Sequence, residues 1–339
     1  MSILKILGKS ARHACLLGVL LTATVGLKAE SGENLLIRLR DQMAQTTDVK
    51  ARQALLDQVA QAGTFQAMAY AAEWLGNPTK ALAKSAAKAV VDIATKHPEY
   101  NGTNTRQWVS RALPLVKGEA KARAKAYLLI MPKDEAGYVS LFNGKDLTGW
   151  KGLVENPIKR AKMTSEELAK AQVKADEAMH KDWAVENGLL AYVGHGYDNI
   201  CTKELYGDFE MLVDWKLDPN GKEPDAGIYL RGTPQVQIWD TARVNVGAQV
   251  GSGGLYNNKK NQSIPTCVAD NKVGEWNTFY IKMVGDRVTV DLNGERVVNS
   301  VILENYWDRS QPIFPVEQLE LQAHGSKVYY RDIYVKRLK

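Results

Sequence analysis

Cysteine and histidine are scarce in this sequence, and no apolar run is long enough to span a membrane. The 339 residues include three cysteines and five histidines. No Cys/His spacing typical of a zinc site occurs among them. Cys201 and Cys267 are the only cysteines after residue 29. They could pair in an oxidising compartment or stay free, and the spacing leaves both readings open.

The first 29 residues have the composition of an export signal. A basic start is followed by an apolar run from residue 14 to residue 27, and Ala29 offers a small residue before Glu30. The run is shorter than the ~20 residues of a membrane span, although an uncleaved anchor is the alternative. We therefore expect an exported protein, periplasmic or extracellular, with no membrane span after signal removal.

The basic balance of the chain does not indicate nucleic-acid binding. The formal net charge is +6 and the pI is about 9.0. Residues 1–29 contain four basic residues and no acidic ones, so cleavage would lower the charge to +2. Because the excess charge lies largely in the leader, we expect no nucleic-acid partner.

Residues 33–131 are predicted to be α-helical. Leu35, Leu36, Leu39 and Met43 recur at helical spacing, and Gly and Pro divide the segment into pieces of helix length. Asp48 and Thr79 are candidate N-caps. The pattern suggests a small bundle or stacked HEAT-like hairpins, without a clean repeat period. Because this segment has no cluster of His, Cys or carboxylate side chains that would suggest chemistry, we expect it to be structural or to contact a protein partner.

From residue 138 to residue 339 the pattern changes to short alternating runs separated by Gly, Asn, Asp and Pro. Asn293-Gly294 is a strong hairpin signal. Many short strands without intervening helices predict an antiparallel β-sandwich of the jelly-roll kind. Residues 158–181 are the exception, because they form a charged helical insertion that begins with a capping box at Thr164 and Glu167.

One stretch, residues 227–240, is predicted to be two strands joined by a Gly-Thr-Pro turn. Alternation places Ile228 and Leu230 on one face, and Val236 and Ile238 on the corresponding face of the second strand. The opposite face is then polar and aromatic; it carries Tyr229, Arg231, Gln235, Gln237 and Trp239. Rings and planar hydrogen-bonding groups suit a sugar, although a solvated outer face has the same pattern.

Other strands present polar groups in the same way. Glu320, Gln322 and His324 alternate with apolar residues, as does Asp214 in the run from residue 209 to residue 217. If these faces line one concave sheet, six side chains converge on one cleft: Asp214, Arg231, Gln237, Glu320, Gln322 and His324. Such a set could perform acid/base chemistry and orient a sugar.

Loops supply further candidates. The glycine-rich segment 251–260 is not followed by a helix pattern, so we expect a rim loop that presents Tyr256 and Asn257 rather than a phosphate loop. Residues 218–225 resemble a calcium loop without its full spacing. Residues 305–309 form a polar-aromatic cluster that suits either a site or internal packing. Glycosidase chemistry would need two carboxylates, and no signature selects a pair among Asp214, Asp240, Glu304 and Glu320.

Several motifs, in order, resemble the 3-keto-disaccharide hydrolase domain family. They are residues 138–150 (YVSLFNGKDLTGW), 206–210, 227–231, 235–240, 274–278, 321–325 and 331–333. The resemblance covers residues 138–339 and leaves out the helical segment. It implies a concanavalin A-like jelly roll in an exported bacterial protein, and a substrate glycoside already oxidised at C3.

The resemblance also implies a chemistry. A ketone at C3 acidifies the C2 hydrogen, so a base can remove it, the C1 substituent can leave and water can add. By matching positions, we expect Asp214 or Asp240 to act as base or metal ligand, and His324 as acid, base or ligand. Arg231 and Gln237 would polarise the ketone or hold hydroxyls, and Trp239 or Tyr229 would stack on the sugar. Asp214 and Gln235 stand where many relatives carry Glu. A divalent metal is compatible with this scheme but not required by it.

Three other functions remain open from the sequence. The same face would serve a non-catalytic carbohydrate-binding module, because fold alone does not determine activity. An ordinary endo-glycosidase acting on unoxidised polysaccharide is the second alternative. An interaction protein whose helical segment is the working part is the third.

Overall fold

The computed structural model describes residues 29–194 and 196–338. The predicted export segment lies outside the described residues apart from Ala29. Within the described ranges, no helix is long and apolar enough to cross a bilayer. Residues 31–194 and 196–338 belong to one compact unit.

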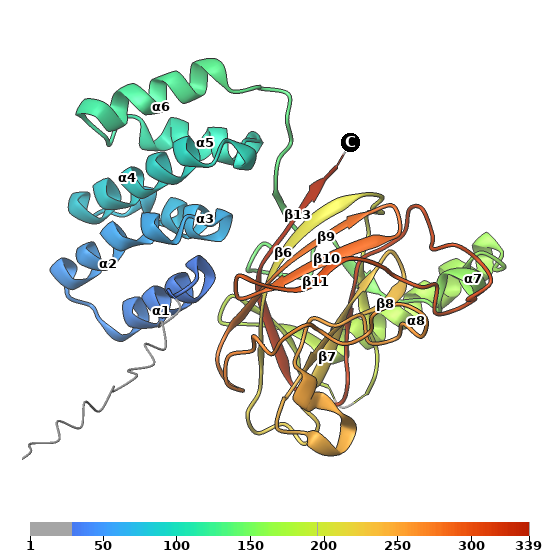
Figure 1. Ribbon diagram of the computed structural model, residues 1–339. Helices are drawn as coiled ribbons and strands as arrows, with labels where there is room; N and C mark the ends of the chain where they lie inside the picture. Colours follow the sequence, from blue (N-terminus) through green and yellow to red (C-terminus); the bar gives the residue numbers. More distant parts are fainter. Residues whose placement is uncertain (1–28, 195, 339) are drawn as a thin grey trace, which may run out of the picture. The chain divides into compact units, whose positions relative to one another are not determined.

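The predicted helical segment is confirmed, and it consists of three stacked hairpins (Figure 1). The helices are α1 (Gly32–Gln45), α2 (Val49–Ala62), α3 (Phe65–Glu73), α4 (Lys80–Lys96), α5 (Thr103–Ala112) and α6 (Gly118–Ile130), with short 3-10 turns η1 (Trp74–Gly76) and η2 (Pro98–Tyr100). Helices α1 and α2, α3 and α4, and α5 and α6 pack within hairpins, whereas α4 packs on both α2 and α6 between hairpins. This arrangement matches the stacked-hairpin alternative.

The caps of these helices follow local side-chain chemistry. Asp48 accepts a hydrogen bond from the backbone N–H of Ala51 at 2.8 Å, as predicted for an N-cap. Thr79 occupies the N-cap position of α4, but its side chain makes no capping bond. Gly63 ends α2 with a φ of 66°, a left-handed conformation that favours glycine.

The predicted antiparallel sandwich is also confirmed, since two sheets follow the helices. The strands are β1 (Val139–Ser140), β2 (Trp150–Gly152), β3 (Trp183–Glu186), β4 (Leu189–Tyr192), β5 (Ile200–Thr202), β6 (Phe209–Leu217), β7 (Asp225–Leu230), β8 (Thr233–Trp239), β9 (Asn277–Val284), β10 (Arg287–Leu292), β11 (Glu295–Ile302), β12 (Glu320–Gln322) and β13 (Val328–Arg337). The large sheet has the order β11-β10-β9-β6-β13-β4-β3, with β1 paired to β13. The small sheet has the order β2-β5-β12-β7-β8.

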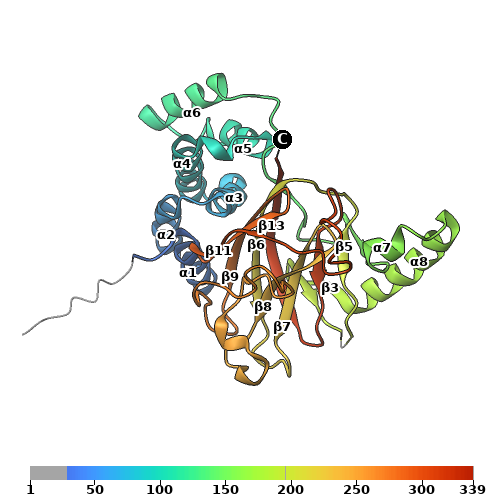
Figure 2. The ribbon, with the colours of Figure 1, turned by 45° about the vertical axis from the view of Figure 1, so that its right-hand side comes forward.

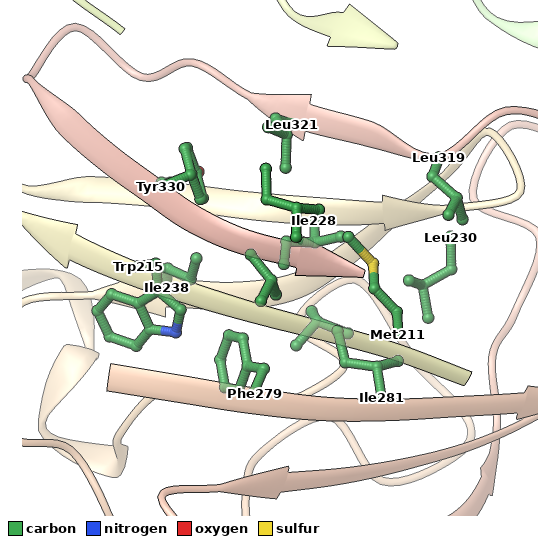
Figure 3. Close-up of a cluster of buried hydrophobic side chains, with 14 of the residues drawn as sticks. Met211, Trp215, Ile228, Leu230, Ile238, Phe279, Ile281, Leu319, Leu321 and Tyr330 are labelled. Atoms are coloured by element: carbon green, nitrogen blue, oxygen red, sulfur yellow. The ribbon is translucent and has the colours of Figure 1, made fainter. Parts of the chain in front are cut away.

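The core lies between the two sheets and is built from the inward-facing residues of each strand. Met211 and Trp215 of β6, and Ile228 and Leu230 of β7, are buried in one cluster with the inward residues of β9, β12 and β13 (Figure 3). The alternation predicted for residues 209–217 and 227–240 therefore sorts these faces correctly. Polar residues of the same strands point away from the core, and the outer face of the large sheet also carries Leu212 and Tyr334, which pack on the helical cluster.

The turn between β7 and β8 differs from the prediction. Arg231 and Gly232 form it, with φ values of 49° and 70°, whereas Thr233 and Pro234 already belong to β8. Positive φ at both central residues is typical of the tight turns that suit the twist of hairpin strands. Strand β8 ends the small sheet, and an edge strand tolerates a proline that lacks the N–H group.

The helical insertion is α7 (Pro157–Arg160) followed by α8 (Ser165–Asp182) (Figure 2). The capping box is present, because Thr164 Oγ1 accepts from the N–H of Glu167 at 3.2 Å and the Glu167 carboxylate accepts from the N–H of Thr164 at 2.8 Å. Helix α8 packs closely on β2, where a Cβ at Gly152 would overlap the carbonyl oxygen of Ala175. Two short 3-10 turns, η3 (Val244–Val246) and η4 (Ala248–Val250), follow β8.

The helical hairpins cover the outer face of the large sheet. Arg40 of α1 forms an ion pair with Asp332 of β13, and Asn271 Nδ2 donates to Asn34 Oδ1 of α1 at 2.8 Å. The Phe65 ring of α3 lies 4.7 Å from that of Tyr138 and 5.1 Å from that of Tyr334. The outer face of the large sheet is therefore an interface between the helices and the sandwich.

Candidate functional site

The outer face of the small sheet gathers most of the predicted site residues. Seven side chains from strands β7, β8 and β12 and the segment after β12 define what we call the polar face: Asp225, Tyr229, Gln235, Gln237, Glu320, Gln322 and His324. Register aligns them across strands, because Glu320 pairs with Tyr229, and Gln322 pairs with Gly227, which pairs with Gln237.

Glycine at position 227 leaves room for the amide groups at the centre of this face. A Cβ there would lie 2.8 Å from the side-chain carbon Cδ of Gln235 and 3.0 Å from Oε1 of Gln322. Gln235 Nε2 donates to Gln237 Oε1, and Gln237 Nε2 donates to Asp225 Oδ1 at 2.8 Å. Gln322 Oε1 is buried without a hydrogen-bond partner among the described residues. Hydrogen bonds therefore fix the side chains of Gln235 and Gln237, whereas Gln322 Oε1 remains an acceptor for a ligand.

Asp225 and His324 bring charge to one end of the polar face. Burial raises the pKa of Asp225, while the His324 ring, the Gln237 hydrogen bond and the Arg243 guanidinium act to lower it. Arg243 Nη1 lies 3.6 Å from Asp225 Oδ2. His324 Nε2 lies 3.8 Å from Glu223 Oε2, and its Nδ1 lies 3.5 Å from Gln322 Nε2. The imidazole is 32% exposed and the Asp225 side chain 13%, so His324 is the more accessible group.

Glu320 lies at the buried floor of the same face. The residue is 2% exposed, and its Oε2 atom has no hydrogen-bond partner among the described residues. Burial raises the pKa of Glu320 to about 8; Arg160 and a hydrogen bond from Asn199 oppose the shift, and Glu317 adds to it. A carboxyl group with this pKa is largely protonated at pH 7 and can donate a hydrogen bond.

Tyr229 links this floor to the open part of the face. Burial and the neighbouring Glu320 raise the pKa of the Tyr229 phenol, so it stays neutral at ordinary pH. Asn199 hydrogen bonds to both Tyr229 and Glu320. The three side chains form one neutral cluster of hydrogen-bond donors and acceptors.

Aromatic rings stand around the rim of the polar face. Tyr256 is 50% exposed, and its ring lies 5.1 Å from that of Trp239, which is buried and donates from Nε1 to the carbonyl oxygen of Gly251 at 2.9 Å. Tyr197 is 64% exposed, with its ring 5.1 Å from the His324 ring. Exposed rings beside a row of amides are the kind of surface that sugars contact.

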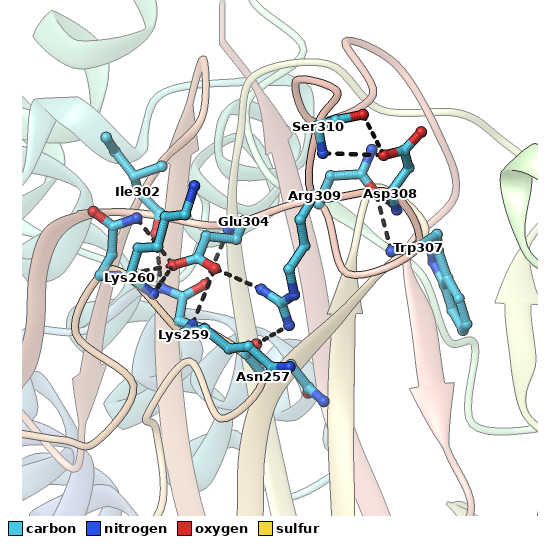
Figure 4. A network of polar contacts seen from close by, with 12 residues as sticks. Asn257, Lys259, Lys260, Ile302, Glu304, Trp307, Asp308, Arg309 and Ser310 are labelled. Carbon is cyan, nitrogen blue, oxygen red and sulfur yellow. Dashed lines mark hydrogen bonds and ion pairs between the residues drawn. The ribbon is translucent and has the colours of Figure 1, made fainter.

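The loop that carries Tyr256 and Asn257 is fixed by Glu304 and Arg309 (Figure 4). The Glu304 carboxylate accepts from the backbone N–H groups of Lys259, Lys260 and Asn261 at 3.0, 2.6 and 2.8 Å. These bonds outweigh the effect of burial and lower the pKa of Glu304 to about 2. Arg309 pairs with Glu304 at 2.5 Å and donates to the carbonyl oxygen of Asn257 at 2.6 Å. This arrangement favours the internal-packing interpretation of residues 305–309.

The predicted convergence is wrong for Asp214. Its strand, β6, belongs to the large sheet, and Asp214 points to the outer face that the helices cover. The carboxylate accepts from Thr278 Oγ1 at 2.7 Å and from Arg331 Nε at 3.1 Å. Alternation gave the correct polar side of the strand, but it does not say which of the two sheets the strand joins.

The predicted convergence is also wrong for Arg231. Because Arg231 forms the β7–β8 turn, strand alternation does not apply to it. Its guanidinium donates to the carbonyl oxygens of Pro315 and Gly285, and lies 3.8 Å from Asp208. Arg231 therefore ties loops together at the edge of the sandwich. Asp240 follows β8 and accepts from the N–H of Ala242 at 2.9 Å, so it closes a turn beside the face.

Two contributors to the site, Asn199 and Arg243, were not among the predicted site residues, and a third, Asp225, was considered only as the end of the calcium-loop candidate. Asp225 lies two residues before the predicted start of its strand. Extending the strand would have placed Asp225 on the same face as Gly227 and Tyr229, and this alternation is the signal that could have identified it. Asn199 and Arg243 lie in loops, where spacing carries no such information. Among the described residues, Cys201 and Cys267 are free: Cys201 is buried opposite Glu320, and Cys267 is exposed.

The described residues contain no group of three or more His, Cys, Asp or Glu side chains arranged to hold a metal ion. The calcium-loop candidate instead forms a turn, in which Asp218 Oδ1 accepts from the N–H of Asn220 at 2.9 Å.

Comparison with known proteins assigns the family. A sequence profile of the 3-keto-alpha-glucoside-1,2-lyase-like domain matches residues 137–336, which is more than half of the chain. The chain belongs to this family. A 3-keto-disaccharide hydrolase of Bacteroides thetaiotaomicron is 23% identical over 262 residues, which cover 62% of this chain and 81% of that relative.

Solved structures resemble this member of the 3-keto-alpha-glucoside-1,2-lyase-like family more loosely. A putative glycosyl hydrolase from Parabacteroides distasonis is 24% identical, with a TM-score of 0.44 over 60% of this chain and 94% of that one. A carbohydrate-binding module from Bacillus subtilis is 12% identical, with a TM-score of 0.34 over 56% of this chain and 96% of that one.

Proposed function

We propose that this protein cleaves the glycosidic bond of 3-keto-glycosides, including 3-keto-disaccharides, on the polar face of the small sheet. The observation that carries the proposal is His324. It is an accessible imidazole set among amides and carboxylates, on the face that the family motifs at residues 227–240 and 321–325 build. Family membership supports the substrate class.

The reaction begins with the acidity that a C3 ketone confers on the C2 hydrogen. A base takes that proton, and the electron pair left on C2 is delocalised into the ketone as an enolate. The pair then forms the C1=C2 bond as the C1–O bond breaks, and the leaving oxygen takes up a proton. Water adds across the double bond, with its oxygen at C1 and a proton at C2, so the net result is hydrolysis.

His324 is the proposed base, because it is the more accessible of the two charged groups at its end of the polar face. The nearby charge of Asp225 would stabilise the imidazolium that forms when His324 takes the C2 proton. Tyr229 and the amide of Gln322 would donate to the ketone oxygen as the enolate develops. Glu320 acts here as a positioning residue that holds Tyr229 through Asn199. Tyr256 would contact the sugar ring at the rim.

The test follows the fate of the C2 hydrogen. The purified chain is incubated in D₂O with a 3-keto-disaccharide and with its unoxidised parent, each with and without chelator. Elimination and hydration should release a keto sugar that carries deuterium at C2, above the exchange seen without protein. Direct hydrolysis at C1 would leave hydrogen at C2 and would contradict the proposed route. Loss of activity with chelator would establish a divalent metal requirement.

Variants connect this reaction to the site. His324→Ala should lower turnover by at least ~100-fold, within the usual range for loss of a general base. His180→Ala, at an exposed position on α8, is the matched control and should have no effect. A loss of less than about tenfold in His324→Ala would rule out His324 as the base.

A carbohydrate-binding module is the second candidate, because exposed rings and amides on a sheet face can bind sugars without chemistry. Binding of glycans to the polar face with no cleavage of either substrate would favour this reading. Cleavage of the unoxidised parent would instead favour an ordinary glycosidase. Export of the protein and a protein partner for the helices stay predictions.

A further inference from the structure

A cavity lies far from the polar face, between the helical hairpins and the outer face of the large sheet. Its volume is about 460 Å³, which falls within the range of small-molecule sites. It is lined by Arg40, Asp41, Met43, Ala44, Arg52, Tyr70, Trp74, Asn187, Leu189, Lys216, Trp276 and Arg331. We call it the interface cavity. Neither a helical hairpin nor the sandwich forms it alone.

Two cations of the large sheet share one aromatic ring at this cavity. The Arg331 guanidinium lies 3.9 Å and the Lys216 ammonium 5.0 Å from the centre of the Trp276 ring. Lys216 also lies 5.2 Å from the Tyr329 ring. Aromatic faces attract cations, but they do not replace a carboxylate partner.

Lys216 has no carboxylate within ion-pair distance in the described part of the chain, and Arg331 Nη2 has no hydrogen-bond partner there. Burial and the neighbouring charge of Arg331 lower the pKa of Lys216. Unused donors on two neighbouring cationic side chains favour an anion as the ligand.

The carboxylates around the cavity offset much of its positive charge, but they leave these donors unused. Arg40 pairs with Asp332, and Arg331 pairs with Asp214 at 3.1 Å, so these two carboxylates are already engaged. Asp41 is the only acidic residue that lines the cavity, against the remaining cations Lys216 and Arg52. Asp218 also acts on Lys216, and Glu73 acts on Arg40 and Arg331, so the case for an anionic ligand rests on the unused donors of Lys216 and Arg331 and not on net charge.

The rest of the lining suits a ring. Trp74 and Tyr70 present aromatic surface from the helical side, and Arg52 lies 5.8 Å from the centre of the Trp74 ring. We propose that the interface cavity binds a small ligand that combines one carboxylate with a sugar-sized ring, such as a uronic acid. The carboxylate contacts Lys216 and Arg331, and the ring lies between the aromatic walls. The proposal is independent of the reaction at the polar face.

Binding of defined probes to the full chain tests the proposal, by titration calorimetry and tryptophan fluorescence. Sodium glucuronate supplies ring and carboxylate, glucose the ring alone, acetate the carboxylate alone, and inorganic phosphate a different anion. We expect glucuronate to bind at least about tenfold more tightly than each of the other three and to change Trp276 fluorescence. Equal binding of phosphate or acetate would refute the ring requirement, and no glucuronate binding would refute the site.

Four variants place the binding event. Lys216→Met should weaken glucuronate binding by about tenfold or more, and Arg52→Gln should weaken it as an independent check from the helical side. Lys282→Met, a partly exposed lysine on the same sheet face that faces Glu210 at 3.6 Å, is the matched control. His324→Ala should leave glucuronate binding unchanged. Loss of binding in His324→Ala but not in Lys216→Met would place the probe on the polar face and overturn the proposal.

Discussion

Glu320 is a carboxyl group held where water scarcely reaches it. With a pKa of about 8 in the folded protein, against 4.5 when exposed, it keeps its proton over a pH range in which the unfolded chain loses it. The free energy of unfolding should therefore fall as pH rises from about 4.5 to 8, by up to about 1.4 kcal/mol per pH unit from this group.

Glu320→Gln should remove that part of the pH dependence, because an amide does not titrate. Urea unfolding of both proteins at several pH values between 5 and 8 measures it. Glu186→Gln, at a more exposed position that pairs with Lys327, serves as the control. Parallel curves for the native protein and Glu320→Gln would show that Glu320 is ionised when folded.

Gly227 should matter for activity more than for stability. Gly227→Ala would push its Cβ into the Gln235 and Gln322 amides, which can rotate away at a cost of about 1 kcal/mol or less. Their displacement should lower kcat/KM at least tenfold. Gly207→Ala is the matched control, because a Cβ there meets its nearest atoms at 3.6 and 3.7 Å. Unchanged kinetics in Gly227→Ala would show that the Gln235 and Gln322 amides do not contribute to the reaction.

At the scale of elements, the loop from residue 255 to residue 262 depends on one carboxylate. Glu304→Gln replaces an ion with a neutral amide that accepts backbone hydrogen bonds less strongly, so we expect a loss of about 1–3 kcal/mol in stability. KM should rise more than kcat falls, because Tyr256 is carried on this loop. Amide hydrogen exchange at residues 259–261 should accelerate, and unchanged protection there would contradict the assigned role.

Strands and helices could be read from the sequence, whereas the pairing of strands into sheets could not. The alternation in residues 209–217 and 227–240, the capping box at Thr164 and the turn at Asn293-Gly294 are local signals, and the structure contains each of them. Asp214 shows the limit, since the choice of sheet depends on contacts between distant strands. Glu320, Gln322 and Gln237 were placed together correctly, because β12 and β8 lie on either side of β7 in the small sheet.

At the scale of the whole molecule, the helices and the sandwich should unfold together. Phe65 is 1% exposed and contacts Tyr138 and Tyr334 across the interface. Phe65→Ala should cost about 3–5 kcal/mol. Circular dichroism of the helices and fluorescence of the sandwich tryptophans should give one transition in the native protein and two in the variant.

The control for that prediction is Leu129→Ala on α6, where the side chain is 82% exposed. It should leave the transition unchanged. Two separate transitions in the native protein would show that the interface does not couple the parts.

The covered face of the large sheet has a practical consequence for recombinant production. Leu212, Tyr280 and Tyr334 point outward from that sheet and pack against the helical cluster. A sandwich expressed from residue 137 onward would expose this apolar surface to solvent and should precipitate or self-associate. Replacing these three side chains with polar ones should be needed before the sandwich can be handled alone.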